Sequence, residues 1–144
     1  MKAHWPDAAV EVTVTDTPDG GRPQPRFVLE DDLERLLAAG AAAPPRTVRL
    51  LGPYDPYLQL RDRTLLVANE AHRKDLWRVL GRPGAIVADG EVAGTWRPRA
   101  AGRRFTLLIQ PWASLPSTDR ARLDEEAERL AAHRGAELAG IVEG

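Results

Sequence analysis

Residues 85–96 read Ala-Ile-Val-Ala-Asp-Gly-Glu-Val-Ala-Gly-Thr-Trp, and this stretch decides the fold of the larger part of the chain. Two runs that suit β-strands flank an Asp-Gly pair, which is typical of the type I′ turn of a tight hairpin. Residues 100–102 supply the next turn, and residues 103–111 predict a third strand. Three successive antiparallel strands predict a small sheet that forms part of a barrel.

Further elements are predicted on both sides of this meander. Residues 47–51 predict a buried strand and residues 64–67 a short apolar strand. Asn69 suits the N-cap of a helix from Glu70 to Leu80, and Ser117 the N-cap of a helix that ends near residue 134. Residues 135–144 leave two alternatives open, a last strand or a frayed end. In the helix that follows Asn69, the side chains expected to face inward are Ala71, Leu76, Val79 and Leu80, and those expected to face outward are Arg73, Lys74 and Arg78.

The first 43 residues predict a separate, wing-like module. Valines alternate with polar residues from residue 9 to 15, a loop rich in glycine and proline follows, and residues 26–29 predict the returning strand. Glu30–Ala39 predicts a helix with acidic residues in its first turn and Gly40 at its end. Residues 41–45, Ala-Ala-Ala-Pro-Pro, suit a linker, because proline cannot continue a helix.

The fold class predicted from these patterns is α+β. A wing-like β-hairpin plus helix (residues 1–43) precedes a small antiparallel sheet or partial barrel flanked by helices (residues 44–144). At 144 residues the chain has room for one domain or for two small modules.

Composition excludes several classes of chemistry. The chain has no cysteine, which removes disulfides, thiolate zinc sites and thiol catalysis. Its histidines, at positions 4, 72 and 133, lack metal-ligand spacing, and no nucleotide-binding glycine motif is present. We therefore expect no metal and no cofactor. No apolar run is long enough to span a membrane and no secretory signal is recognisable, so we expect a cytoplasmic protein.

The net charge of −1 hides an uneven distribution. Residues 61–104 hold ten Arg and Lys against five Asp and Glu, a net +5, whereas the segments before and after each carry −3. A guanidinium stays charged and presents a planar set of donors that suits phosphate oxygens. The alternative is an ordinary solvated surface in a chain whose basic residues are nearly all arginine.

The hairpin that ends near residue 100 carries the most concentrated charge. Arg97, Arg99, Arg103 and Arg104 are expected to meet there, and phosphate oxygens would relieve their mutual repulsion. Alternatively, Arg97 and Arg103 face opposite sides and pair with acids such as Glu91. Tryptophan on a strand belongs more often to the core than to a ligand site, and this applies to Trp96, although a role in stacking on a base is the alternative. Trp77 and Trp112 are likewise expected to anchor helices to the sheet.

A second local motif is Gly52-Pro53-Tyr54-Asp55-Pro56, in which the two prolines require a turn. Asp55 beside proline is expected to cap this turn, and the alternative is that it orients an arginine through a bidentate ion pair. Arg61 and Arg63 follow the turn and join the candidate phosphate contacts.

The order of these landmarks resembles the C-terminal part of a bacterial winged-helix DNA-binding family. The resemblance covers about residues 9 to 134 and is carried by Leu50-Leu-Gly-Pro-Tyr-Asp-Pro-Tyr-Leu58, Glu70-Ala-His-Arg-Lys-Asp-Leu-Trp77 and Thr95-Trp-Arg-Pro-Arg99. The family includes DNA glycosylases that excise alkylated purines and unhook interstrand crosslinks. The resemblance therefore implies DNA repair and double-stranded DNA as the partner.

The resemblance does not supply a catalytic residue. The family's glycosylases use a Gln-x-Gln pair in their N-terminal part, and no two of Gln24, Gln59 and Gln110 are two residues apart. We therefore expect a non-catalytic DNA-binding module. One alternative is an interaction module that completes a separately encoded N-terminal half or forms a homodimer, which predicts exposed apolar side chains on the first hairpin and helix. Another is a glycosylase-type enzyme with an unrecognised site near Asp55 and Trp96.

Overall fold

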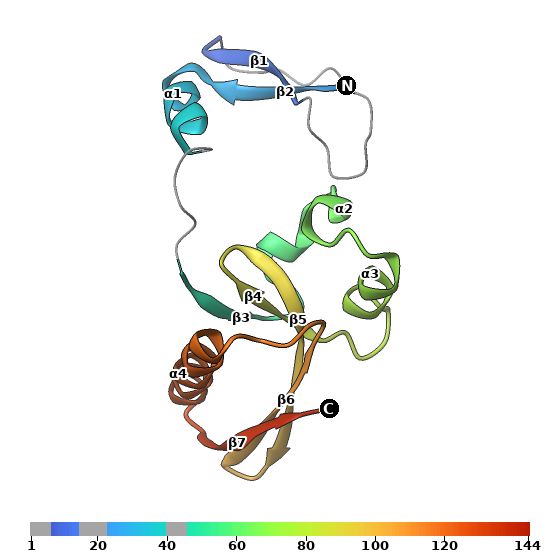
Figure 1. The fold of residues 1–144 in the computed structure, drawn as a ribbon, viewed down its shortest axis with the longest axis vertical. Helices are drawn as coiled ribbons and strands as arrows, with labels where there is room; N and C mark the ends of the chain where they lie inside the picture. Colours follow the sequence, from blue (N-terminus) through green and yellow to red (C-terminus); the bar gives the residue numbers. More distant parts are fainter. Residues whose placement is uncertain (1–6, 15–22, 40–45) are drawn as a thin grey trace. The chain divides into compact units, whose positions relative to one another are not determined.

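The computed structural model describes residues 7–14, 23–39 and 46–144. The chain divides into two compact units, Met1–Ala43 and Pro44–Gly144, which are called the N-terminal unit and the C-terminal unit below (Figure 1). The predicted Gly40 cap, the linker of residues 41–45 and most of the first loop lie outside the described residues. That the two units are separate domains in solution stays a prediction.

The N-terminal unit is a hairpin followed directly by a helix. Strand β1 (Ala9–Val14) pairs antiparallel with β2 (Gln24–Leu29), and α1 (Glu30–Ala39) begins at the next residue. Three acidic residues occupy the first turn of α1, where the helix dipole favours them. No residue of α1 is buried. Four large apolar side chains of this unit are exposed, namely Phe27, Leu29, Leu36 and Leu37.

The C-terminal unit is built on a curled five-stranded sheet in the order β3-β4-β5-β6-β7 (Figure 1). Strands β3 (Val48–Leu51), β4 (Gly84–Ala88), β5 (Glu91–Ala101) and β6 (Arg104–Pro111) are antiparallel. Strand β7 (Glu137–Glu143) pairs parallel with β6, because α4 (Ser117–His133) makes the crossover that a parallel pair needs. The α+β fold class is confirmed, and the last ten residues supply an edge strand.

The Asp-Gly turn between β4 and β5 is confirmed. Both turn residues have positive φ, 50° at Asp89 and 90° at Gly90, as a type I′ turn requires. Asp89 also holds the chain just before β3, because its Oδ1 accepts the Thr47 N–H at 2.8 Å and its own N–H donates to the Thr47 carbonyl at 2.8 Å.

Each face of the sheet carries its own hydrophobic cluster. On the first face, Trp96, Phe105, Leu107 and Ile109 pack with Leu123 of α4 and its neighbours. The second face is covered by a short 3₁₀ helix, η1 (Pro56–Gln59), and by α2 (Arg63–Leu66) and α3 (Glu70–Leu76). Figure 1 shows α4 on one side of the sheet and α3 on the other. We call these two sides the α4 face and the α3 face. The second cluster contains Leu58, Val67, Leu76, Trp77, Ala85 and Val87.

Two predicted elements before β4 are wrong. Residues 64–67 do not form a strand: α2 is a single helical turn, which places Leu66 and Val67 in the core and leaves Leu65 exposed. The helix after Asn69 ends at Leu76, not Leu80, because the Arg78 Nε donates to the Gly81 carbonyl and turns the chain back. Val79 and Leu80, predicted to face inward, are 92% and 85% exposed, and Ala71 is exposed as well.

The N-cap of helix α4 lies one residue earlier than predicted. Ser117 is its first helical residue, Pro116 occupies the N-cap position, and no side chain caps the helix. Asp119 in the first turn pairs with Arg122 at 3.1 Å instead.

Within the described ranges, no helix is both long and apolar enough to cross a membrane.

Candidate nucleic-acid interface

Three of the four predicted hairpin arginines lie on the same face of the sheet. In β5, Trp96 points into the core of the α4 face, so the alternation of a strand sends Arg97 and Arg99 to the α3 face. The register pairs Arg104 with Ala101 and Thr106 with Arg99, which brings Arg104 to that same face. Helix α3 does not reach this end of the hairpin, and Arg99 and Arg104 are exposed. We call Arg97, Arg99 and Arg104 the arginine row.

The arginine row has little acidic compensation. Glu137 on β7 lies opposite Arg104, with 3.7 Å between the Arg104 Nε and the Glu137 Oε2, and both side chains are mostly exposed. An exposed ion pair of this kind contributes little to stability. Arg97 forms no ion pair with Glu91 in the described part of the chain, and its Nε is buried without a hydrogen-bond partner there. A buried unpaired donor is costly. Because this nitrogen is closed to solvent, a phosphate would contact Arg97 through its other guanidinium nitrogens.

Arg103 stands apart from the row. It occupies the turn between β5 and β6 and lines a cavity of about 690 Å³ together with Glu128 of α4 and Leu138 of β7. The turn therefore does not bring four guanidinium groups onto one face of the sheet. Three of the arginines share the α3 face, and Arg103 lines a cavity beside α4.

Asp55 and Trp96 have structural partners. The Asp55 Oδ1 accepts the Tyr57 N–H at 2.9 Å and so caps η1, and no ion pair between Asp55 and an arginine occurs among the described residues. Trp96 is 3% exposed, and its Nε1 donates to the Leu51 carbonyl at 3.0 Å. Because its ring is enclosed in the core of the α4 face, Trp96 cannot stack on a base.

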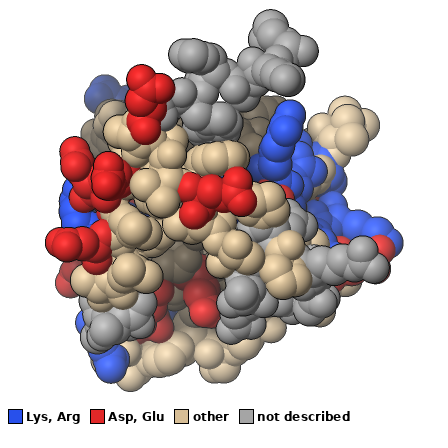
Figure 2. All heavy atoms as spheres, turned by 90° about the horizontal axis from the view of Figure 1, so that it is seen from above, with Lys and Arg blue, Asp and Glu red and all other residues tan. Residues whose placement is uncertain are grey.

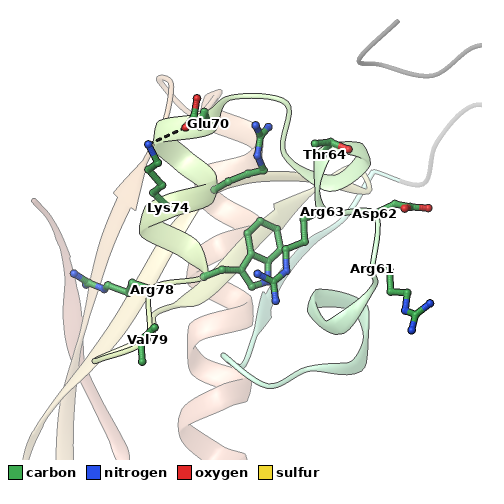
Figure 3. A pocket seen from close by; sticks show the side chains of 10 residues that line it. Arg61, Asp62, Arg63, Thr64, Glu70, Lys74, Arg78 and Val79 are labelled. Atoms are coloured by element: carbon green, nitrogen blue, oxygen red, sulfur yellow. Dashed lines mark ion pairs between the residues drawn. The ribbon is translucent and has the colours of Figure 1, made fainter. Parts of the chain in front are cut away.

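Arg61 and Arg63 line an open cavity of about 510 Å³ between α2 and α3 (Figure 3). Helix α3 begins here because the Asn69 Oδ1 accepts the N–H groups of Ala71 and His72, which confirms the predicted N-cap. The Arg63 guanidinium carbon lies 5.1 Å from the centre of the Trp77 ring. We call this cavity the basic pocket. Its lining consists of Arg61, Asp62, Arg63, Thr64, Glu70, Arg73, Lys74, Trp77, Arg78 and Val79.

Sequence reasoning missed the contribution of α3 to this pocket. Arg73, Lys74 and Arg78 were expected only to face solvent, yet they complete a basic lining with the two arginines that precede α2. Arg73 donates from Nη1 to the carbonyls of Val67 and Ala68. Lys74 pairs with Glu70 at 2.8 Å, and this hydrogen bond holds the pKa of the Glu70 carboxyl below its ordinary value. Three basic residues within six positions, close after two arginines, were the available signal.

The basic pocket and the arginine row belong to the same side of the C-terminal unit. Asp75 of α3 connects them, because it accepts a 3.5 Å hydrogen bond from the Thr95 hydroxyl and lies 3.8 Å from the Arg78 guanidinium. Thr95 precedes Arg97 by two residues on β5 and therefore shares its face. Figure 2 shows the largest group of Lys and Arg side chains on the right of the view, with others along the left edge. The α3 face thus carries a basic surface with two parts.

One of the remaining cavities offers different chemistry. His72 and Trp112 stack with their ring centres 4.2 Å apart beside a cavity that Asp89 and Glu91 also line. This cavity has an acidic rim and does not suit phosphate. No group of three or more His, Cys, Asp or Glu side chains that could hold a metal occurs among the described residues.

Comparison with known proteins gives the family. A protein-family model described as "DNA glycosylase AlkZ-like" matches residues 1–133. The solved structure of Streptomyces sahachiroi DNA glycosylase AlkZ is similar over 96% of this chain, with 26% sequence identity and a TM-score of 0.66, and this chain spans 34% of the length of that one. No match is found among curated proteins. The resemblance to a DNA glycosylase family is confirmed, and the chain belongs to the DNA glycosylase AlkZ-like family.

Proposed function

We propose that this chain is a non-catalytic DNA-binding module of the AlkZ-like family and that it contacts the phosphates of double-stranded DNA through the arginine row. One observation carries the proposal: Arg97, Arg99 and Arg104 share one sheet face, and among the described residues Glu137 is the one carboxylate that pairs with them. Such a surface is stabilised by phosphate oxygens, and contacts to phosphates position a protein on DNA without reading its sequence.

In this proposal the chain corresponds to the C-terminal part of a winged-helix glycosylase, with β1, β2 and α1 as the wing-like hairpin and helix. The chain spans about a third of the AlkZ structure that it matches, so the activity of that whole protein is not assigned to it. The absence of a Gln-x-Gln pair from the sequence supports a non-catalytic role.

The other candidate residues have secondary roles. Arg61 and Arg63 extend the contact along the α3 face, and Arg103 contributes from the turn. Asp55 and Trp96 are positioning residues: Asp55 caps η1 just ahead of Arg61, and Trp96 holds β5 against the core beside Arg97.

The first test removes the arginine row. The triple variant Arg97→Ala/Arg99→Ala/Arg104→Ala is expected to bind a labelled 20-base-pair duplex about 100-fold more weakly at low salt, because each phosphate contact contributes on the order of 1 kcal/mol there. Fluorescence anisotropy measures the change. The matched control Arg35→Ala/Arg46→Ala/Arg120→Ala removes the same charge from other exposed arginines and should cost a few-fold at most. Equal losses in the two triple variants would reject the arginine row as the contact surface.

A second candidate role is favoured by the exposed apolar side chains of the N-terminal unit. Phe27, Leu29, Leu36 and Leu37 are between 43% and 72% exposed, on a unit whose helix buries no residue. Side chains of this kind suit contact with a separately encoded polypeptide or with a second copy of the chain. Sedimentation equilibrium separates the cases, because a homodimer doubles the mass with rising concentration, whereas a strict monomer leaves only a different polypeptide as the partner.

A further inference from the structure

The basic pocket is larger than a contact to one phosphate requires. A groove that only tracks a DNA backbone can be shallow, whereas sites for whole small molecules are concavities of roughly 300 to 1,000 Å³. The basic pocket, at about 510 Å³, falls within that range. This open pocket therefore has room for a nucleotide, with a base and a sugar as well as a phosphate.

The charge of the pocket lining favours an anion. Five basic side chains and two acidic ones line it, a net charge of +3. Figure 3 shows Glu70 and Lys74 on one side of the pocket, Arg61 and Asp62 on the opposite side, and Arg63 between them. A concave surface lined mostly by one sign of charge raises the local concentration of ions of the opposite sign.

Arg73 is held in a conformation that leaves donors available. Its Nη1 is engaged by the carbonyls of Val67 and Ala68, which fix the guanidinium against the start of α3. A guanidinium carries five N–H donors, and those on Nε and Nη2 have no partner among the described residues. Because its side chain is already ordered, Arg73 loses little conformational freedom when it binds a phosphate.

Arg63 and Trp77 provide a surface for a base. Trp77 is buried and fixed, because its Nε1 donates to the Leu58 carbonyl at 2.9 Å. The exposed Arg63 side chain lies over this ring, 5.1 Å from its centre. A guanidinium plane supported in this way can stack on an unpaired base, a contact that proteins use with single strands and that a base inside a duplex cannot make.

We infer that the basic pocket binds one nucleotide of a single-stranded DNA segment, with the base stacked on Arg63 and the phosphate held by Arg73 and Arg61. The inference rests on the proposed function insofar as DNA is the ligand. It adds a separate single-strand site on the same side of the C-terminal unit as the arginine row. The stacking surface of Arg63 serves only the single strand, whereas the duplex depends mainly on the arginine row, so the two ligands can be tested separately.

The test compares two labelled ligands by fluorescence anisotropy at low salt: a single strand of ten thymidines and a fully paired hairpin duplex. Arg63→Ala and Arg63→Lys should each bind the single strand about tenfold more weakly, because stacking on a base is lost in both. Binding of the duplex, to which Arg63 adds one phosphate contact, should weaken only about threefold in Arg63→Ala and stay close to wild type in Arg63→Lys, which keeps the charge. The exposed Arg35→Ala serves as the charge-matched control, and circular dichroism confirms that each variant is folded.

Three results would overturn the single-strand site. The first is a wild-type protein that does not bind the strand, and the second is an Arg63→Lys variant that binds it as well as wild type does. The third is an equal loss of affinity for both ligands, since the site would then serve the duplex. Failure of the wild type to bind duplex speaks against the proposed function, whatever the strand result. A 5′-phosphate on the strand that tightens binding supports a terminal nucleotide in the pocket, and no effect supports an internal one.

Discussion

Gly84→Ala is expected to destabilise the C-terminal unit by roughly 3 kcal/mol, through overpacking and the loss of a buried hydrogen bond. Gly84 pairs with Trp96 across β4 and β5, and the indole lies over its backbone. A Cβ at residue 84 would stand 2.4 Å from the Leu51 carbonyl oxygen and 2.4 Å from the Trp96 Nε1. Those two atoms form a hydrogen bond in the structure, so the methyl group would separate them.

Urea unfolding followed by tryptophan fluorescence measures this effect, because three of the four tryptophans belong to the C-terminal unit. Gly52→Ala is the matched control: no atom lies within 4 Å of a Cβ built there, and its stability should stay within about 0.5 kcal/mol of wild type. A Gly84→Ala variant as stable as the control would mean that Trp96 does not pack as described.

Glu126→Ala is expected to cost about 2 kcal/mol, because the change leaves the buried Leu50 N–H without an acceptor and removes the charged hydrogen bonds from Arg129. Glu126 of α4 is 7% exposed and accepts the Leu50 N–H from the free edge of β3. The Arg129 guanidinium donates two hydrogen bonds to the same carboxylate, at 2.7 and 2.8 Å. The control is its exposed neighbour Glu125→Ala, which should change the free energy of unfolding by less than about 0.5 kcal/mol. Similar losses at the two positions would contradict this role.

The same carboxylate gives a pH dependence whose sign follows from its pKa. Burial alone would raise the pKa of Glu126, but hydrogen bonds from Arg129 and Leu50 outweigh this and hold it below the ordinary value of 4.5. A lowered pKa in the folded protein contributes stability that is fully present above pH 4.5 and is lost as the pH falls through the folded value. The difference in unfolding free energy between wild type and Glu126→Ala should therefore narrow on acidification below that pH. A difference that stays constant from pH 7 to pH 3 would contradict a charged Glu126.

Local signals in the sequence predicted the elements that depend on neighbouring residues. The Asp89-Gly90 turn, the Asn69 cap and the bounds of α1 are each determined by a few adjacent side chains, and all three predictions are confirmed. The predicted end of α3 at Leu80 is wrong, because the end of this helix depends on how the chain packs after it. The Arg78 Nε donates to the Gly81 carbonyl there, and Trp77 is buried. Strand β7 was left open for a similar reason, because its partner β6 lies beyond the whole of α4.

The candidate site was predictable in part. The sequence showed a basic segment. Strand alternation puts Arg97 and Arg99 on one face of the sheet, but the place of Arg103 depends on where the turn begins, and the sequence did not determine that position. The basic pocket could not be predicted, because it forms only where the residues before α2 meet α3 across a turn that looked like a strand. The burial of Trp96 agrees with the interpretation that a tryptophan on a strand belongs to the core.

If this chain binds duplex DNA through phosphate contacts, its affinity for the duplex must fall steeply as the salt concentration rises. Anisotropy titrations of a labelled duplex at several salt concentrations give the slope of log Kobs against log salt. Contacts from the three side chains of the arginine row alone predict a slope of about −3, since each neutralised phosphate contributes about −0.9, and added contacts from Arg61, Arg63 and Arg103 predict about −5. Saturable binding with a slope in this range would support phosphate contacts. The absence of binding at the lowest salt, or binding indifferent to salt, would contradict them.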